Sequence, residues 1–252
     1  MSSIKPFVCS TPKDSSLFSE MNHYIYDLDS PYEYDNHKVP RVTSILSEMI
    51  HEEYLMNWAN FVGRVKHMNH STITQESAYI GTKVHDAINK YTTECILPDF
   101  STENVRFKNR IENAFLSFVE WWKIISTHNI EILMAEKSLV CEYYGGTLDM
   151  LLSVDGRIYL IDFKTSNHFS YKYHLQTAAY RRILYTKHNI NIDGIIILKL
   201  SKDNVFFEEQ VIDLTTYDGI IYIDQCDSFF LSLLYAYYNK NRVVSVFEKM
   251  YK

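Results

Sequence analysis

The chain has 252 residues, of which 46% are hydrophobic, and its formal net charge is −6 at pH 7. This length and apolar share suffice to bury one sizeable hydrophobic core. The acidic balance excludes a surface that attracts nucleic acid or an anionic membrane as a whole. Any contact with nucleic acid therefore needs a local basic groove or a bound cation.

Cysteine usage and the first residues bear on the cellular compartment. The four cysteines include no C-x-x-C pair, which argues against a zinc ribbon or a disulfide framework. No apolar run approaches the roughly 20 residues of a membrane span, and the first residues lack the apolar core of a secretory signal. We therefore expect no membrane partner and a cytoplasmic location, in a bacterium or in the host of a phage or virus. A mitochondrial location is less expected because residues 1–16 contain no arginine.

The predicted elements begin after a polar N-terminal segment. Residues 1–38 are expected to be loosely ordered, and residues 39–252 to form a single domain because no Pro/Gly/Ser-rich linker interrupts them. Within this domain we expect a helical lobe over about 39–126 and an α/β core over about 127–252.

Helical spacing marks the first half of the domain. Thr43 or Ser44 is expected to cap its first helix. Apolar residues then recur at helical spacing over 76–93 and 105–126. The first half is therefore predicted to be mostly helical.

Short β-like runs follow, and a strong hairpin signal, Asp155-Gly156, separates two of them. The order after the helical lobe is β-β-β-α-β, with one more strand and a closing helix. The predicted ranges are strands at 131–141, 146–154 and 157–163, a helix at 171–188, strands at 194–200 and 205–212, and a helix at 216–238.

Two of these apolar strands contain an aspartate, Asp149 and Asp162. A carboxylate among apolar residues costs several kcal/mol unless it is paired, hydrogen-bonded or bound to a cation. Because side chains alternate along a strand, Asp162 and Lys164 point to one face and Phe163 to the other. Two carboxylates and the Phe163 backbone carbonyl are hard oxygen ligands suited to Mg²⁺, and a neighbouring lysine can orient a water or offset anionic charge. The set suits phosphodiester hydrolysis, although Asp162 and Lys164 taken alone also fit an ordinary ion pair at a strand end.

Three segments in order, GGTLDMLL, YLIDFKTS and HLQTAAYRRIL, closely resemble the central motifs of the PD-(D/E)XK nuclease superfamily, in its RecB-like exonuclease branch. Upstream, VPRVTSIL and GTKVHDAI resemble the N-terminal helical motifs of phage exonucleases in that branch and of the mitochondrial genome maintenance exonuclease. The likeness spans about residues 39–185. It implies a restriction-endonuclease-like α-β-β-β-α-β core with an N-terminal helical lobe.

The resemblance also implies roles for individual residues. It selects His85, Asp149 and Asp162, with the Phe163 carbonyl, as ligands of Mg²⁺ or Mn²⁺, and Lys164 as the catalytic lysine. A histidine satisfied within its helix is the competing interpretation of His85.

Further candidates surround this set. Gln176 and Tyr180 match the Q-x-x-x-Y motif of the family, and their i, i+4 spacing puts them on one helix face, where they can brace the site or meet the DNA backbone. An amphipathic helix boundary is the alternative. Glu136 matches an acidic position in many relatives and would serve a metal or support its ligands, although an edge-strand surface charge is an equal alternative.

Arg41, Ser44 and Thr165 are additional candidates for DNA binding or site bracing. The residues predicted to form a local basic groove are Arg41, Arg64, Lys66, Lys83, Arg181 and Arg182.

The sequence therefore predicts a metal-dependent DNA exonuclease, acting on single-stranded DNA with a free end in replication, recombination or repair. A structure-specific or site-specific endonuclease of the same superfamily and a non-catalytic DNA-binding module are the alternatives. Some relatives carry an iron–sulfur cluster on one early and three late cysteines, but the late part of this chain offers only Cys226, so no cluster is expected. The chain lacks a G-x-x-x-x-G-K-[ST] motif, so we expect no ATP as a cofactor, and a cooperating helicase or recombination protein would be a separate chain.

Overall fold

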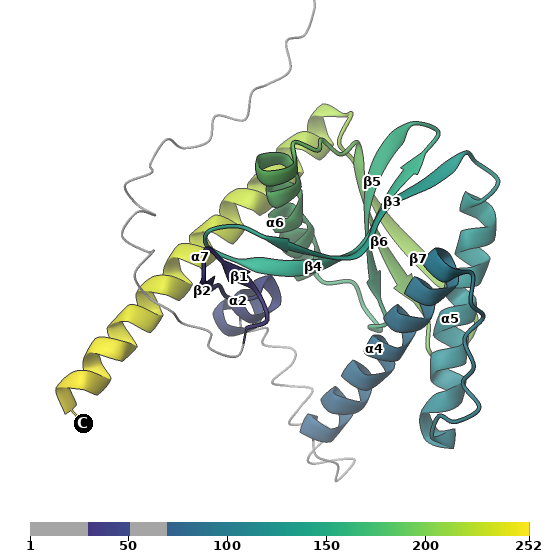
Figure 1. Ribbon diagram of the computed structural model, residues 1–252, viewed down its shortest axis with the longest axis horizontal. Helices are drawn as coiled ribbons and strands as arrows, with labels where there is room; N and C mark the ends of the chain where they lie inside the picture. The colour runs from purple at the N-terminus through teal and green to yellow at the C-terminus, as the bar shows by residue number, and fades with distance from the viewer. Residues whose placement is uncertain (1–29, 51–69, 252) are drawn as a thin grey trace, which may run out of the picture.

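A five-stranded mixed sheet forms the centre of the fold (Figure 1). The computed structural model describes residues 30–50 and 70–251. The one parallel pair of this sheet is β5 (Arg157–Lys164) with β6 (Gly194–Leu200), which a helical crossover connects, as parallel neighbours require. The other neighbouring strands are antiparallel. In spatial order the strands are β3 (Ile130–Val140), β4 (Gly145–Val154), β5 (Arg157–Lys164), β6 (Gly194–Leu200) and β7 (Phe207–Asp213).

Helices cover both faces of the sheet (Figure 1). One core packs α2, α6 and α7 against side chains such as Leu160, and the other packs α4 and α5 against side chains such as Ile161 and Phe163. Alternate residues of β5 therefore enter opposite cores, as the pleat of a strand requires. The helices are α2 (Val42–Met49), α4 (His70–Glu94), α5 (Val105–Ile125), α6 (Tyr171–His188) and α7 (Tyr217–Tyr251).

The predicted elements agree closely with the observed ones. The mixed α/β class is confirmed, and the helix predicted at 171–188 and the strand at 194–200 match α6 and β6 residue for residue. The predicted hairpin turn is also present: Asp155 and Gly156 have φ angles of 50° and 82°, the two positive values of a type I′ turn.

Three expectations need correction. The helix α2 begins at Val42, with Arg41 as its N-cap and no capping side chain, so the predicted cap by Thr43 or Ser44 is wrong. Within the N-terminal segment expected to be loose, a two-stranded hairpin forms from β1 (Glu33–Tyr34) and β2 (His37–Lys38).

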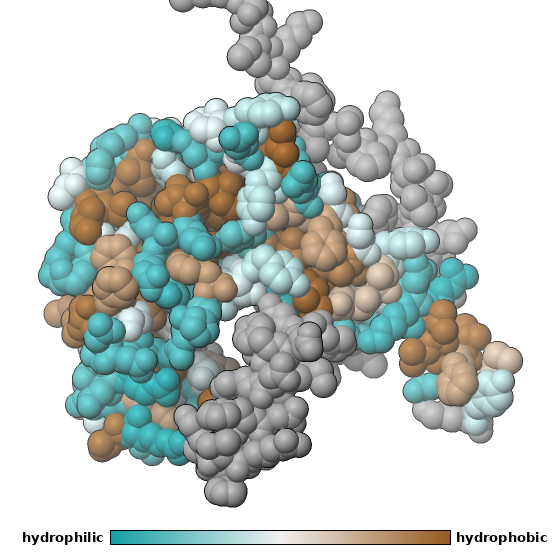
Figure 2. Space-filling view, turned by 180° about the vertical axis from the view of Figure 1, so that it is seen from behind, coloured by the Kyte–Doolittle hydropathy of each residue, from teal (hydrophilic) through white to brown (hydrophobic). Residues whose placement is uncertain are grey.

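The third correction concerns α7, which continues well past the predicted end at residue 238 (Figure 1). Tyr238 is its last buried residue, and beyond it Val243, Phe247 and Met250 each expose 60% or more of their surface. Figure 2 shows this projecting end with its apolar side chains at the edge of the molecule. None of the described helices combines the length and hydropathy needed to cross a membrane.

Candidate functional site

The site lies where β4 and β5 separate. Their ladder ends at the pair Met150↔Ile161, so the register places Asp149 opposite Asp162 just beyond the last pair. The backbone N–H of Phe163 donates to Asp149 Oδ2 at 2.7 Å, so a side-chain oxygen takes up a donor that the ladder leaves there. Both aspartates are buried, with exposed fractions of 9% and 2%. The two carboxylates therefore converge at the divergence of the two strands.

Lys164 lies against the second of these carboxylates. Its Nζ is 2.7 Å from Asp162 Oδ2, and it also donates to Gln176 Oε1 at 3.3 Å. Gln176 Nε2 in turn donates to the hydroxyl of Tyr180, one turn further along α6, at 3.2 Å. Gly146 leaves room for this tyrosine, because a Cβ there would overlap the Tyr180 ring. The predicted pair on α6 thus holds the lysine from one side.

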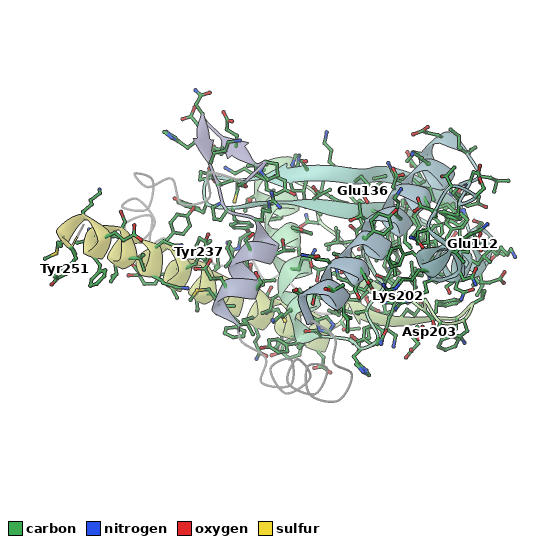
Figure 3. All side chains as sticks on the ribbon, turned by 90° about the horizontal axis from the view of Figure 1, so that it is seen from below. Glu112, Glu136, Lys202, Asp203, Tyr237 and Tyr251 are labelled. Carbon is green, nitrogen blue, oxygen red and sulfur yellow. The ribbon has the colours of Figure 1, made fainter. Side chains whose placement is uncertain are left out.

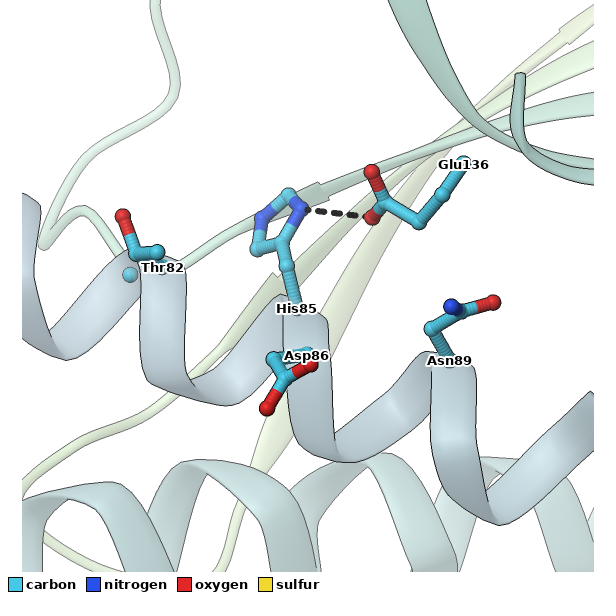
Figure 4. A pocket seen from close by; sticks show the side chains of 6 residues that line it. Thr82, His85, Asp86, Asn89 and Glu136 are labelled. Carbon is cyan, nitrogen blue, oxygen red and sulfur yellow. Dashed lines mark ion pairs between the residues drawn. The ribbon is translucent and has the colours of Figure 1, made fainter. Parts of the chain in front are cut away.

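The helix α4 supplies the site from the opposite face of the sheet. His85 Nδ1 lies 3.2 Å from Asp149 Oδ1. It also lies 3.6 Å from Glu136 Oε1, and Figure 4 shows this second pair. One turn earlier, Gly81 lets α4 approach the end of β5, since a Cβ there would already touch Thr165 Oγ1 at 3.4 Å. Ligand atoms of the histidine and the two acids all lie within 4.8 Å of one another, a spacing that would let them share one metal ion.

Glu136 has an unusual backbone for a strand residue. Its φ of 45° is in the left-handed region, which costs a non-glycine residue about 1–3 kcal/mol. The register puts it between the pairs Ala135↔Met150 and Lys137↔Leu148, that is, opposite Asp149. The strained residue is thus the one whose carboxylate meets His85. We interpret the strain as part of how β3 presents this carboxylate.

The charges of the cluster shift one another. Burial, reinforced by the nearby Asp149 carboxylate, raises the pKa of Asp162 to about 6 although Lys164 opposes the rise. Burial also opposes ionisation of Asp149, but the His85 imidazolium outweighs it and lowers the pKa of that carboxyl. Burial alone would lower the pKa of His85; the Asp149 carboxylate instead raises it to about 10. Burial would likewise lower the pKa of Lys164, and the Asp162 and Asp149 carboxylates raise it.

Asp162 Oδ2 is fully buried and is paired with the Lys164 ammonium at 2.7 Å. The Asp149 carboxylate accepts from the Phe163 backbone and meets His85. Buried carboxylates that converge in this way beside an imidazole can bind a divalent cation. The donor set, three carboxylates and an imidazole beside the Phe163 carbonyl, is the chemistry of a hard divalent cation. The residues therefore fit Mg²⁺ or Mn²⁺.

Solvent reaches this cluster through a pocket along α4. The pocket has a volume of about 400 Å³, and Figure 4 shows His85 and Glu136 facing each other across it. Its lining residues are Gly81, Thr82, His85, Asp86, Asn89 and Glu136.

Other predicted residues are placed differently. Arg41 joins the sheet through its backbone, which bridges to Gly145, and Ser44 lies inside α2, where its carbonyl accepts the Ser47 hydroxyl. Thr165 follows directly after Lys164, beside Gly81.

The predicted basic groove does not gather around the site. Arg181 pairs with Asp224 at 2.9 Å, Arg182 with Asp227, and Lys83 with Glu103 at 2.6 Å. These cations neutralise acids of the fold itself. Arg64 and Lys66 lie outside the described residues.

The sequence reasoning missed one contact. The Tyr173 ring lies 4.9 Å from Lys164 Nζ, within the range of a cation–π interaction. Its position three residues before Gln176, on the same face of α6, was a signal that would have found it.

Comparisons with known proteins add little. No protein-family model matches the chain, and no curated protein matches it. Among solved structures, a phage-related exonuclease from Haemophilus somnus 129PT aligns at 12% identity over 84% of this chain and 97% of its own, with a TM-score of 0.36. The protein SSO0001 aligns at 13% identity over 61% of this chain and 74% of its own, with a TM-score of 0.28. Likenesses this low constrain neither fold nor function, so the site geometry has to support any functional conclusion.

Proposed function

We propose that this chain is a metal-dependent nuclease that hydrolyses phosphodiester bonds of DNA, on a core of the PD-(D/E)XK type. The observation that carries the proposal is the convergence of the buried Asp149 and Asp162 beside Lys164, where two strands diverge. Ligand atoms of His85, Glu136 and Asp149 also lie within 4.8 Å of one another. A single structural ion pair at a strand end does not require this crowding of carboxylates.

In the proposed mechanism Asp149, Asp162 and the Phe163 carbonyl hold the cation, with His85 and Glu136 on the α4 side. A bound divalent cation supplies an activated water and neutralises charge on the phosphate. Lys164, whose pKa is raised by its two carboxylate neighbours, stays an ammonium at neutral pH. It therefore offsets negative charge on the transferred phosphoryl group and does not act as a base.

Gln176 and Tyr180 position this ammonium. Burial, with the Asp162 carboxylate adding to it, holds the pKa of Tyr180 well above its ordinary value, so the hydroxyl keeps its proton. A neutral hydroxyl accepts from Gln176, whose amide oxygen is then directed at Lys164. This relay limits the rotamers open to the lysine.

We further propose that the substrate is a single strand with a free end. The cluster is bounded by α4 through His85 and by α6 through Gln176, so a strand has to reach the phosphate-binding edge between two helices. Such an arrangement suits one strand better than a duplex, and stacking on aromatic side chains would hold bases without reading their sequence. The biological role would lie in DNA replication, recombination or repair.

The test uses end-labelled linear single-stranded DNA, the same strand circularised, and linear duplex DNA, at matched salt in Mn²⁺. The wild-type protein should degrade the linear single strand, and Asp162→Asn should lower the rate about 10³-fold, the scale of losing a charge-stabilising group. The matched control is Asp155→Asn, which makes the same chemical change at an exposed turn where Asn-Gly is equally favourable. His85→Ala should be milder than Asp162→Asn, because the imidazole must first give up the proton that Asp149 stabilises on it and then holds a hard cation less strongly than a carboxylate does.

Metal dependence gives the second arm. Mg²⁺ or Mn²⁺ should support cleavage and excess chelator should stop it, whereas Ca²⁺ should bind without turnover. Full activity in excess chelator contradicts the mechanism. Rapid degradation of the circle would instead favour the endonuclease alternative, and DNA retention without any cleavage would favour a non-catalytic binding module.

A further inference from the structure

A second lysine near the site has a surprising environment. Lys202 lies in the loop between β6 and β7, and only 6% of its surface is exposed. Buried ammonium groups are normally paired with a carboxylate or fully hydrogen-bonded. Within the described part of the chain, the Lys202 ammonium has neither an ion pair nor a hydrogen bond. Among the described residues, the fold therefore gives this largely buried lysine no ion-pair partner.

The nearest charged groups make this burial less favourable still. Burial lowers the pKa of Lys202, the Arg110 guanidinium on α5 lowers it further, and Asp203 opposes these effects without forming an ion pair. Lys202 and Asp203 lie next to each other and apart from Glu136 (Figure 3). Arg110 lies on α5 one turn before Asn113, whose side chain donates to the Lys202 carbonyl. An anion bound near both cations would offset their charges.

The position of Lys202 is held by the fold. The Asn113 side chain of α5 donates to the Lys202 carbonyl at 3.1 Å, and the Phe206 backbone N–H donates to Ser117 Oγ of the same helix at 2.9 Å. Both ends of the loop are thus fastened to α5. The buried ammonium is consequently part of a built site, not of a loose surface loop.

This site shares an edge of the sheet with the candidate catalytic cluster. The strands β5 and β6 are parallel, with Lys164 paired to Lys199, and Lys202 follows three residues later. With about 3.8 Å between consecutive Cα atoms and about 4.8 Å between paired strands, the Cα atoms of Lys164 and Lys202 lie within about 16 Å of each other. A nucleic-acid strand bound at the catalytic cluster would span this distance within a few nucleotides.

We infer that Lys202 and Arg110 form a second phosphate-binding site, which holds a phosphate group of the DNA strand away from the bond being cleaved. A guanidinium binds two phosphate oxygens at once, and an ammonium adds a point charge, so the pair matches a phosphate. The assignment to a DNA strand rests on the proposed function; the affinity for phosphate does not. The competing account is a lysine whose aliphatic stem merely fills space against α5.

The experiment measures binding of a labelled single-stranded oligodeoxynucleotide in excess chelator, over a series of salt concentrations. Lys202→Met keeps the stem and removes the charge, and it should weaken binding about tenfold and lower the slope of log affinity against log salt by about one. The matched control, Lys123→Met, removes the same charge from an exposed, ion-paired position on α5 and should change both quantities much less. Equal behaviour of the two variants at every salt concentration would overturn the inference.

Arg110→Met gives an independent variant, since this side chain is only partly buried and its loss leaves the core intact. It should weaken binding as Lys202→Met does, and unchanged binding in both variants would again overturn the inference. Inorganic phosphate should compete with the oligonucleotide for the wild-type protein more strongly than for either variant.

One further comparison distinguishes a terminal phosphate from a backbone phosphodiester, and another distinguishes failure of the proposed function from failure of this inference. An oligonucleotide with a terminal phosphate is compared with one ending in hydroxyls: a loss confined to the phosphorylated form identifies a terminal phosphate, and an equal loss identifies a backbone phosphodiester. If the wild-type protein cleaves nothing but Lys202→Met still weakens phosphate binding, the proposed function fails and this inference stands. If cleavage requires Asp162 but Lys202→Met binds like the control, this inference fails and the proposed function stands.

Discussion

Two lysines at one edge of the sheet, the partly buried Lys164 and the buried Lys202, differ in the partners that the fold gives them. Lys164 lies 2.7 Å from the Asp162 carboxylate and donates to Gln176, and these neighbours raise its pKa in spite of burial. Lys202 is buried against α5 and forms no ion pair with a described residue, and burial, with the Arg110 guanidinium adding to it, lowers its pKa. Burial disfavours the charged form of both side chains, so the neighbouring groups alone decide the sign of the net shift.

This difference separates two uses of a buried cation. The first, Lys164, compensates the carboxylates that the fold crowds together at the candidate metal site, and this pairing is present without any substrate. The second is compensated only when an anion arrives, so its electrostatic energy is released on binding. A lysine of the second kind lowers the stability of the free protein, which is a known consequence of preparing a binding site in advance.

Kinetics should show the largest contrast. We expect Lys164→Met to lower kcat for the linear single strand about 10³-fold, since it removes the cation next to the reacting phosphate. Lys202→Met should lower kcat/KM about tenfold and act through KM, because it removes binding at a distance from the chemistry. Steady-state rates over a range of DNA concentrations separate the two effects. A large kcat loss in Lys202→Met would show that the two lysines belong to one site.

Replacing each of the two lysines by methionine should change the stability of the folded protein in opposite directions. Removing Lys164 leaves Asp149 and Asp162 without their shared cation, and we expect Lys164→Met to lower the free energy of unfolding by about 3 kcal/mol, the cost of breaking a buried pair. Lys202→Met replaces an unpaired buried charge by an apolar side chain of similar size, and it should raise stability by about 1 kcal/mol. Urea denaturation at neutral pH without added metal or phosphate measures both. Destabilisation of similar size in both variants would mean that Lys202 has a compensating partner within the fold.

The smallest expected effect is the pH dependence of the stability gained in Lys202→Met. The unfolded lysine has an ordinary pKa of 10.5, and Lys202 has a lower one in the fold. As pH rises through the folded pKa toward 10.5, the folded protein loses this proton first, so its stability relative to the unfolded chain increases. The advantage of Lys202→Met over wild type should therefore shrink between pH 7 and pH 10. Lys164 has a raised pKa and stays charged there, so the deficit of Lys164→Met should persist over the same interval.

Much of the fold was predictable because its signals are local. The i, i+2 alternation of β5 placed Asp162 and Lys164 on one face, and the turn signal at Asp155 marked the hairpin. The limit of such reasoning is visible in α7: apolar spacing does continue toward its end, but local patterns do not reveal that the helix leaves the core after Tyr238.

The candidate site was predictable only in part. A carboxylate inside an apolar strand is a signal that can be read from its immediate neighbours, and this singled out Asp149 and Asp162. Nothing local indicated that Glu136 would adopt a left-handed backbone opposite Asp149, since that depends on how β3 pairs with β4. The roles proposed for these residues remain predictions until the variants are measured.

By itself the sequence determined the order of the elements, the strand faces and the two buried acids, because helical and strand periodicity and turn chemistry act over a few neighbouring residues. The tertiary structure alone decided which charges are compensated. Arg182, expected in a basic groove, is neutralised by Asp227 of α7, whereas Lys202, which no motif marks, is buried against α5 beside Arg110. Electrostatic energy depends on distance in space and on burial, and residues 45 or 89 positions apart come together only when the chain has folded.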